Sequence, residues 1–175
     1  LEFDPDKGRQ MLKEAGWDGA RVLKMNVPLG NKAREQSADM IVQNLDKVGV
    51  KVQIATHDFP THMVNARSGN FDLLLMGMPG FVDPNMEQQY QTKAQNNFMR
   101  YSSAESDKLL AAGTAEPDPA KRKGIYHKLQ QIWNADVPLI TLYSPQDFLA
   151  VSKRVKVGEP KTFGMFYNLH EWDVE

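Results

Sequence analysis

The sequence contains no cysteine, and this absence excludes several functions at once. A chain without thiols has no disulfide framework, no thiolate nucleophile and no metal site built on cysteine. No apolar run approaches the roughly 20 residues of a membrane-spanning helix. No block of Lys and Arg supplies the charge that dominates binding to nucleic acid or to an anionic membrane, and the formal net charge is only -1. The 175 residues are long enough to bury a proper core in about one domain.

Catalytic signatures are also missing. The chain has no G-x-S-x-G elbow, P-loop or G-x-G-x-x-G motif. Its histidines are predicted to lie on the surface or in loops, and the spacing of His57 and His62 does not place both rings on one helical face to hold zinc. An enzyme would have one candidate site, His57 with the adjacent Asp58 at the end of a predicted strand. The nine methionines are better explained by packing than by soft-metal binding. We therefore predict no catalytic residue, no metal and no cofactor.

Hydrophobic periodicity predicts strands that alternate with helices. This order is typical of an α/β fold, a sheet with helical crossovers. Asp4, Pro5 and Gly16 mark the start and end of the first helix. The predicted elements are a helix over 4–16, a strand over 22–27, a helix over 33–48, a strand over 50–58, a helix from 59 to Gly69 or Asn70, a strand over 71–78, helices over 84–92, 104–115 and 118–134, and one or two strands around Pro145.

The stretch "FDLLLMGMPGFVDP", residues 71–84, is an apolar run that stops at a Pro-Gly turn. Because the run hardly alternates, the strand is predicted to be buried on both faces. Asp83 and Pro84 then resemble the start of a helix, with Asp83 as its cap. Ligands of α/β sheets bind beyond the carboxyl ends of the strands, so this turn is predicted to form the rim of a cleft. The predicted ligand-binding residues are Met78, Pro79, Gly80, Phe81, Val82 and Asp83.

Six segments, in order, resemble the C-terminal part of the bacterial extracellular solute-binding proteins of family 5, the receptors of ABC importers for oligopeptides, dipeptides and nickel. Each segment alone is a weak signal, but six in register cover nearly the whole chain. The first departs from the family pattern at Gly8 and Met11. The segments are "FDPDKGRQMLKEAGW", "SADMIVQNLDKVGVKVQI", "SGNFDLLLMGM", "YSSAESDKLLAAG", "DPAKRKGIYHKLQQIWNADVPLITLY" and "SKRVKVGEP".

The resemblance implies a periplasmic-binding-protein-like lobe with a mixed β-sheet flanked by helices. Family members have two lobes that close on a solute, so residues 1–157 are expected to form the C-terminal lobe and residues 158–175 to return to a missing N-terminal lobe. We thus expect a piece of a longer protein that is periplasmic or lipid-anchored outside the cytoplasmic membrane. The partners implied are a small-molecule or peptide ligand, the missing lobe and the membrane permease subunits, with no nucleic acid. A further hypothesis stays open, in which the receptor presents its ligand to a sensor and not to a permease.

The rim departs from the pattern of the peptide-binding members. Those proteins have Gly-Trp at the strand end and, three residues later, an aspartate that pairs with the ligand's terminal ammonium. Here the strand end is Gly77-Met78, and the aligned position is Phe81. A buried ammonium without a carboxylate partner is costly. The expected ligand is therefore a modified or longer peptide, with an oligosaccharide, an opine-like compound or a nickel chelate as alternatives, and not a dipeptide with a free amino terminus.

Overall fold

The computed structural model describes residues 3–78, 83–146, 148, 150–157, 164, 166 and 168–174. The chain divides into two compact units, which are described separately. The first comprises residues 1–79 and 88–101, and the second comprises residues 80–87 and 102–175. Strands alternate with helices only in the first unit, which confirms the α/β class predicted from the sequence.

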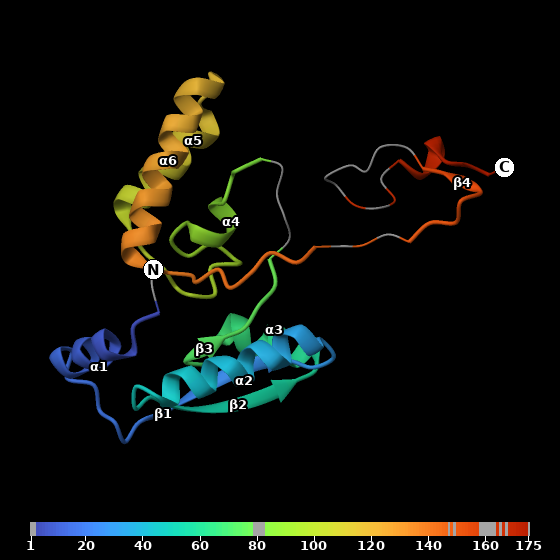
Figure 1. Cartoon of the computed structure of the whole chain (residues 1–175). Coiled ribbons are helices and arrows are strands. Elements are labelled where there is room, and N and C mark those ends of the chain that lie inside the picture. The colour runs from blue at the N-terminus through green and yellow to red at the C-terminus, as the bar shows by residue number, and fades with distance from the viewer. Residues whose placement is uncertain are drawn as a thin grey trace. The chain divides into compact units, whose positions relative to one another are not determined.

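The first unit is built on a parallel sheet of three strands in the order β2-β1-β3 (Figure 1). Strand β1 (Val22–Pro28) is central, and β2 (Lys51–His57) pairs with it along its whole length, from Val22 opposite Lys51 to Pro28 opposite His57. Strand β3 (Leu73–Leu74) pairs with Met25 and Asn26 on the other side. Because all three strands are parallel, their carboxyl ends lie at one edge of the sheet.

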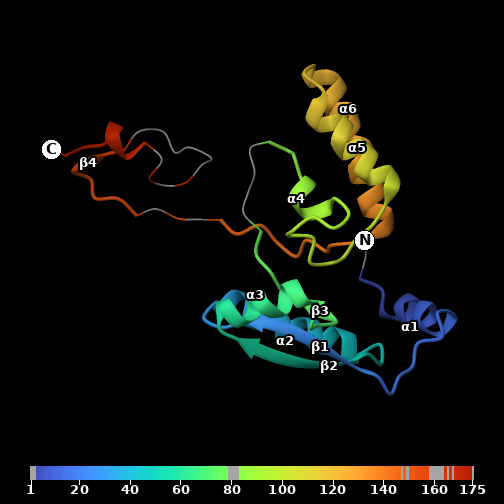
Figure 2. The same cartoon turned by 180° about the vertical axis from the view of Figure 1, so that it is seen from behind.

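The first unit contains residues 88–90 of the short helix α4 (Glu87–Tyr90). Three longer helices also belong to this unit, and an acidic or amide side chain caps each one. They are α1 (Pro5–Glu14), α2 (Lys32–Asp46) and α3 (Phe59–Ser68). The caps Asp4, Asn31 and Asp58 each accept a hydrogen bond from the backbone N–H three residues later, which satisfies an otherwise unpaired donor of the first turn. Helices α2 and α3 cover opposite faces of the sheet (Figures 1 and 2).

The two faces of the sheet differ in chemistry. Met25, Val27 and Ala38 form a buried apolar cluster between β1 and α2. Half-buried apolar side chains pack against this cluster, namely Ile41, Val52, Ile54, Leu73 and Leu75. Asn26 points to the other face because consecutive side chains of a strand alternate. It is completely buried, as is His62 of α3, so the α3 face contains buried polar groups.

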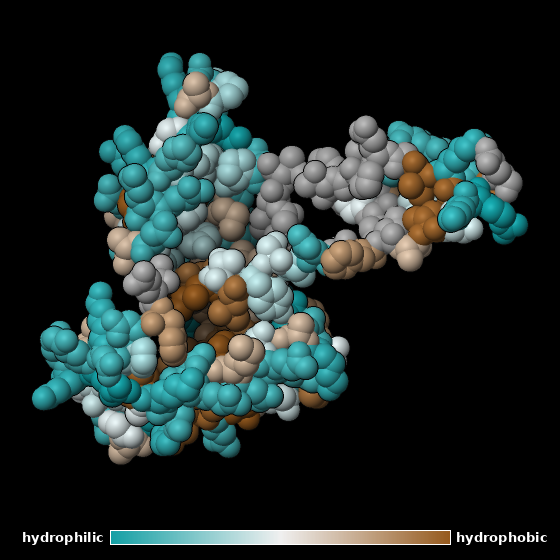
Figure 3. Space-filling view, in the orientation of Figure 1, coloured by the Kyte–Doolittle hydropathy of each residue, from teal (hydrophilic) through white to brown (hydrophobic). Residues whose placement is uncertain are grey.

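The second unit contains the long helices α5 (Ala104–Ala115) and α6 (Pro119–Asp136). They pack against each other, and each contains a completely buried leucine, Leu110 in α5 and Leu129 in α6. The indole N–H of Trp133 donates to the Ser106 hydroxyl across 3.0 Å. The face of this helix pair that Figure 3 shows is mainly hydrophilic. A helix of a single turn, α4 (Glu87–Tyr90), precedes them in the chain.

Two strand predictions are wrong. Strand β3 has two residues, and Leu73 to Met76 are half-buried instead of buried on both faces, because β3 is an edge strand with β1 as its only partner in the described sheet. No strand forms in the described residues around Pro145. The apolar residues of that segment are exposed, and no described strand pairs with them to complete a sheet: Leu139, Ile140, Leu142 and Tyr143.

The C-terminal segment forms a small antiparallel pair, β4 (Val155–Lys156) with β5 (Asp173–Val174). A 3-10 turn over Leu169–Glu171 precedes β5, and Trp172 packs on Phe166 at 5.8 Å between ring centroids. The division at residue 157, with a tail that joins a second lobe, stays a prediction. No helix within the described ranges combines the length and the apolar character that a bilayer crossing requires.

Candidate functional site

Of the six residues of the predicted rim, the structure describes the first, Met78, and the last, Asp83. Met78 is 38% exposed and follows β3 in the first unit. Asp83 is exposed and belongs to the second unit. Pro79, Gly80, Phe81 and Val82 lie outside the described residues. The assignment of these six residues to ligand binding stays a prediction.

Gly77, the residue directly before the rim, lies close to an arginine. Gly77 lies so close to the guanidinium of Arg34, from α2, that a Cβ at position 77 would overlap Nη2. Arg34 is half-buried and comes from the first turn of its helix. The guanidinium is the far end of a flexible side chain, so a Cβ at position 77 would displace it. The contact places a cation beside the residues that follow β3.

The downstream end of the rim is held by an ion pair. Oδ1 of Asp83 accepts a hydrogen bond from Nη2 of Arg122 across 2.6 Å and from the backbone N–H of Asn85 across 2.8 Å. The bond from Arg122, and then that from Asn85, lowers the pKa of the Asp83 carboxyl. The guanidinium thus balances the charge of this carboxylate.

The prediction that Asp83 caps a helix beginning at Pro84 is wrong. The helix begins at Glu87, and the oxygen of the Asn85 side chain accepts from the Glu87 backbone N–H across 3.0 Å. Asp83 instead bonds to the backbone N–H two residues on, as aspartate commonly does in turns, and to Arg122.

Arg122 is a functional candidate that the sequence analysis missed. Its Nε donates to the Gly113 carbonyl across 2.9 Å, and its guanidinium lies 5.2 Å from the centroid of the Tyr126 ring. The available signal was the spacing of Arg122 and Tyr126, which lie four residues apart on a helix and therefore on one face. The partner residues Asp83 and Gly113 could not be found by spacing.

The enzyme candidate does not form a catalytic pair. The Asp58 carboxylate accepts from the backbone N–H of Thr61 across 2.8 Å at the start of α3, and the Thr61 bond lowers its pKa. Within the described ranges, no hydrogen bond joins His57 to Asp58, and Nε2 of His57 has no partner. Asp58 therefore serves as a helix cap.

The predicted surface or loop position is wrong for His62. Its side chain is completely buried beneath α3, and neither ring nitrogen has a hydrogen-bond partner among the described residues. Burial lowers the pKa of His62, and the nearby His57 and Arg34 lower it further. This histidine is thus held neutral. The sequence does not indicate this burial. His62 shares the buried face of α3 with Ala66, and a polar residue is not expected on a buried helix face.

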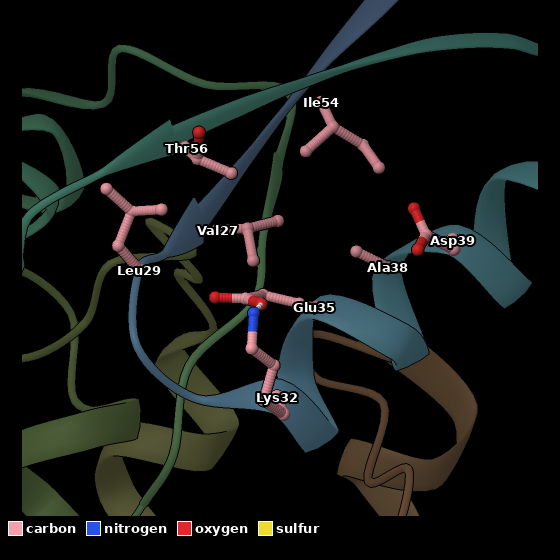
Figure 4. Close-up of a pocket in the computed structure, with 8 residues that line it drawn as sticks. All are labelled: Val27, Leu29, Lys32, Glu35, Ala38, Asp39, Ile54 and Thr56. Atoms are coloured by element: carbon pink, nitrogen blue, oxygen red, sulfur yellow. Dashed lines mark hydrogen bonds and ion pairs between the residues drawn. The ribbon is translucent and has the colours of Figure 1, made fainter.

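A hollow of about 280 Å³ lies on the α2 face of the sheet (Figure 4). Its floor is apolar, and Lys32 and Glu35 form an ion pair of 2.7 Å at its rim. None of its residues was predicted as a ligand contact. They are Val27, Leu29, Lys32, Glu35, Ala38, Asp39, Ile54 and Thr56. Across the described parts of the chain, no three His, Asp or Glu residues gather closely enough to hold a metal ion.

Comparison with known proteins gives the molecule its context. Residues 2–123 match the model of the bacterial extracellular solute-binding proteins, family 5, middle region. The oligopeptide-binding protein AppA of Bacillus subtilis is 28% identical over 191 aligned positions, which cover 98% of this chain and 35% of AppA. The di/tripeptide-binding protein 1 of Pseudomonas aeruginosa is 28% identical, over 95% of this chain and 33% of its own length.

The fold agrees with solved structures of such proteins. The structure of Bacillus subtilis AppA in complex with a nonapeptide superposes with a TM-score of 0.87 at 23% identity, covering 98% of this chain and 38% of that one. At this identity the likeness establishes a periplasmic-binding-protein-like fold. The chain spans about a third of the length of the curated relatives it matches, 35% of the first and 33% of the second.

Proposed function

This chain belongs to the bacterial extracellular solute-binding proteins of family 5, and on that premise we propose that it is one lobe of an ABC-importer receptor. The receptor captures a peptide or peptide-like solute between two lobes outside the cytoplasmic membrane and delivers it to the permease. The names of the relatives, an oligopeptide-binding and a di/tripeptide-binding protein, support the peptide class. In hinged binding proteins the ligand lies between the lobes, so one lobe supplies half of the site.

The observation that carries this proposal is the position of the rim. The carboxyl ends of the three parallel strands lie at one edge of the sheet. The chain leaves β3 at this edge and continues to Met78. Ligands of open α/β sheets bind outside the carboxyl ends of the strands. We propose that the residues from Met78 to Asp83 contact or border the solute there, through an apolar surface that contains Phe81 and Val82.

The charges at the rim support a ligand without a free amino terminus nearby. The position aligned with the ammonium-binding aspartate of the family is Phe81, which has no charge. Asp83 is the next carboxylate, and Arg122 already pairs with it at 2.6 Å. A ligand ammonium would gain little from a carboxylate whose charge is balanced. We therefore propose a longer or amino-blocked peptide as the solute.

The geometry of His57 and Asp58 agrees better with a binding protein than with an enzyme. The Asp58 carboxylate serves the start of α3, and the relatives compared are binding proteins by name. We propose a periplasmic or lipid-anchored location, because the matched family is extracellular. Fractionation of the source cells is expected to place the protein outside the cytoplasm, and recovery in the cytoplasm would contradict the proposal.

Binding can be tested on the full-length protein with three probes. They are one nonapeptide with a free amino terminus, the same nonapeptide acetylated, and an unmodified dipeptide. We expect the acetylated nonapeptide to raise the melting temperature and to bind at least as tightly as the free form in calorimetry, with no product in mass spectra. Tight binding of the dipeptide would overturn the proposed ligand class. Turnover that His57→Ala abolishes would overturn the receptor itself.

A further inference from the structure

We propose that Asp83 and Arg122 form a positioning pair, which attaches the downstream end of the ligand-binding rim to helices α5 and α6. The pair holds Asp83, the last residue of the rim, and offers no charge to the solute. This inference rests on the proposed function, since it concerns the same rim. It assigns a specific task to Arg122, which lies outside the rim in sequence.

Asp83 is attached at one oxygen by two donors. Oδ1 accepts from Arg122 Nη2 at 2.6 Å and from the Asn85 backbone N–H at 2.8 Å. The first bond crosses to α6 and the second closes a local turn. Asp83 is also the residue that follows Val82 directly. Fixing the Asp83 carboxylate therefore fixes the last residue of the rim.

Arg122 is itself held firmly, which makes it suitable as an anchor. Its side chain is only 25% exposed. Nε donates to the Gly113 carbonyl of α5, and the guanidinium lies over the Tyr126 ring of α6. A planar guanidinium with donors on several sides can make these three contacts together. Arg122 thus connects both long helices to Asp83.

A second contact ties the same segment to the helix pair. The Thr114 hydroxyl donates to Oε1 of Glu87 across 2.8 Å. Between the two ties, the Asn85 side chain accepts from the Glu87 backbone N–H. Residues 83–87 are thus attached at their start to α6 and at their end to α5. An attachment at both ends restrains a short segment far more than one exposed ion pair would.

Positioning and direct contact predict different binding profiles. If Asp83 paired with a ligand ammonium, Asp83→Asn would weaken the free nonapeptide and spare the acetylated one. If Asp83 positions the rim, Asp83→Asn and Arg122→Met weaken both peptides by the same factor. We expect a loss of about tenfold, the usual scale for one hydrogen bond to a charged group. The ratio of the two affinities should not change.

The experiment uses the full-length protein, calorimetry with both nonapeptides, and hydrogen exchange of residues 83–87 without peptide. We expect faster exchange of these amides in Asp83→Asn and Arg122→Met. Thr114→Val, which changes no charge, should act in the same direction. Lys51→Met is the matched control, because it removes an exposed ion pair with Asp46 at the amino-terminal start of β2, away from the carboxyl ends of the strands; it should leave exchange and affinity unchanged. The reversed pair, Asp83→Arg with Arg122→Asp, should recover part of the affinity that either single reversal loses.

The outcomes separate the positioning pair from the receptor. A selective loss of the free nonapeptide in Asp83→Asn would overturn the positioning role, as would unchanged exchange of residues 83–87 in Arg122→Met. If the wild-type protein binds neither nonapeptide, the proposed peptide class fails, while the exchange measurement still decides whether the pair holds the segment. If Arg122→Met unfolds, the milder Thr114→Val decides the same question.

Discussion

The ring of Tyr126 lies against the backbone of Gly113, so that a Cβ at position 113 would be 3.0 Å from Cε2 and Cζ of the ring. This close approach brings α5 and α6 together beside Arg122. It allows a sharp comparison of two alanine substitutions, because Gly124 lies in α6 with nothing within 4 Å of its own Cβ position.

Gly124→Ala is expected to stabilise the protein by about 1 kcal/mol, the difference in helix propensity between the two residues. Gly113→Ala gains the same propensity but must displace the Tyr126 ring from a packed position. We expect it to be less stable than Gly124→Ala by at least about 1 kcal/mol, the lower range of overpacking costs. Urea denaturation of both variants measures the difference. Equal stabilisation would show that the ring moves freely.

The stability of the protein is expected to fall on mild acidification because of His62. Its pKa is lowered in the folded protein from the ordinary value of 6.5. Below that value, the unfolded chain binds a proton that the folded chain excludes, so folding is most favourable above about pH 6.5 and weakens as the pH falls toward the folded pKa. The carboxyls with lowered pKa, such as Asp72, act in a lower range, below their ordinary 3.8.

Thermal melts at several values between about pH 7.5 and pH 5 test this expectation. The melting temperature of the wild type should fall over this range. His62→Leu, which keeps the volume and removes the titration, should flatten the profile. His170→Gln is the control, since His170 is exposed, and should keep the wild-type slope. A flat wild-type profile would contradict this expectation, because it would show that the folded protein takes up the same proton as the unfolded chain.

Leu110→Ala is expected to destabilise the protein by about 3 kcal/mol, because it leaves a cavity at a completely buried position. Leu142→Ala removes the same atoms from a side chain that is 48% exposed, and should change stability by less than about 0.5 kcal/mol. Chemical denaturation of the two variants provides the measurement. A large effect at Leu142 would reveal a neighbour for the 138–146 segment.

Asp58 provides a test of helix capping against catalysis. Asn at this position can still accept the Thr61 N–H, whereas Ala cannot. We expect Asp58→Asn to melt near the wild-type temperature and Asp58→Ala to melt lower, with peptide affinity falling only in the second variant. If Asp58→Asn abolished a measurable turnover while the melting temperature stayed constant, the carboxylate would have a chemical role.

The helices were predictable because their signals are local. Asp4, Asp58 and Asp118 begin helices as caps, and α5 has the predicted bounds of 104–115. Strands depend on neighbours that sequence does not display. The apolar run at 71–78 indicates a long strand, yet its ladder extends only alongside the middle of β1.

The sequence predicts a place for the site but not the contacts around it. An apolar strand that ends in a Pro-Gly turn indicates the cleft edge. The ion pair of Asp83 and Arg122 joins residues 39 positions apart. The Arg34 guanidinium lies close to Gly77, which belongs to a different part of the unit. Such contacts depend on packing in three dimensions. A buried histidine beside a buried asparagine also escapes periodicity, because both residue types usually lie on surfaces.

The pairing of β4 with β5 constrains any assembly of this chain with a second lobe. Val155 lies opposite Val174, and Lys156 lies opposite Asp173. A body that receives the last residues must therefore receive Val155 and Lys156 with them, as one two-stranded ribbon. Residue 157 would then not be the boundary between the two bodies, because Val155 and Lys156 lie before it in the chain.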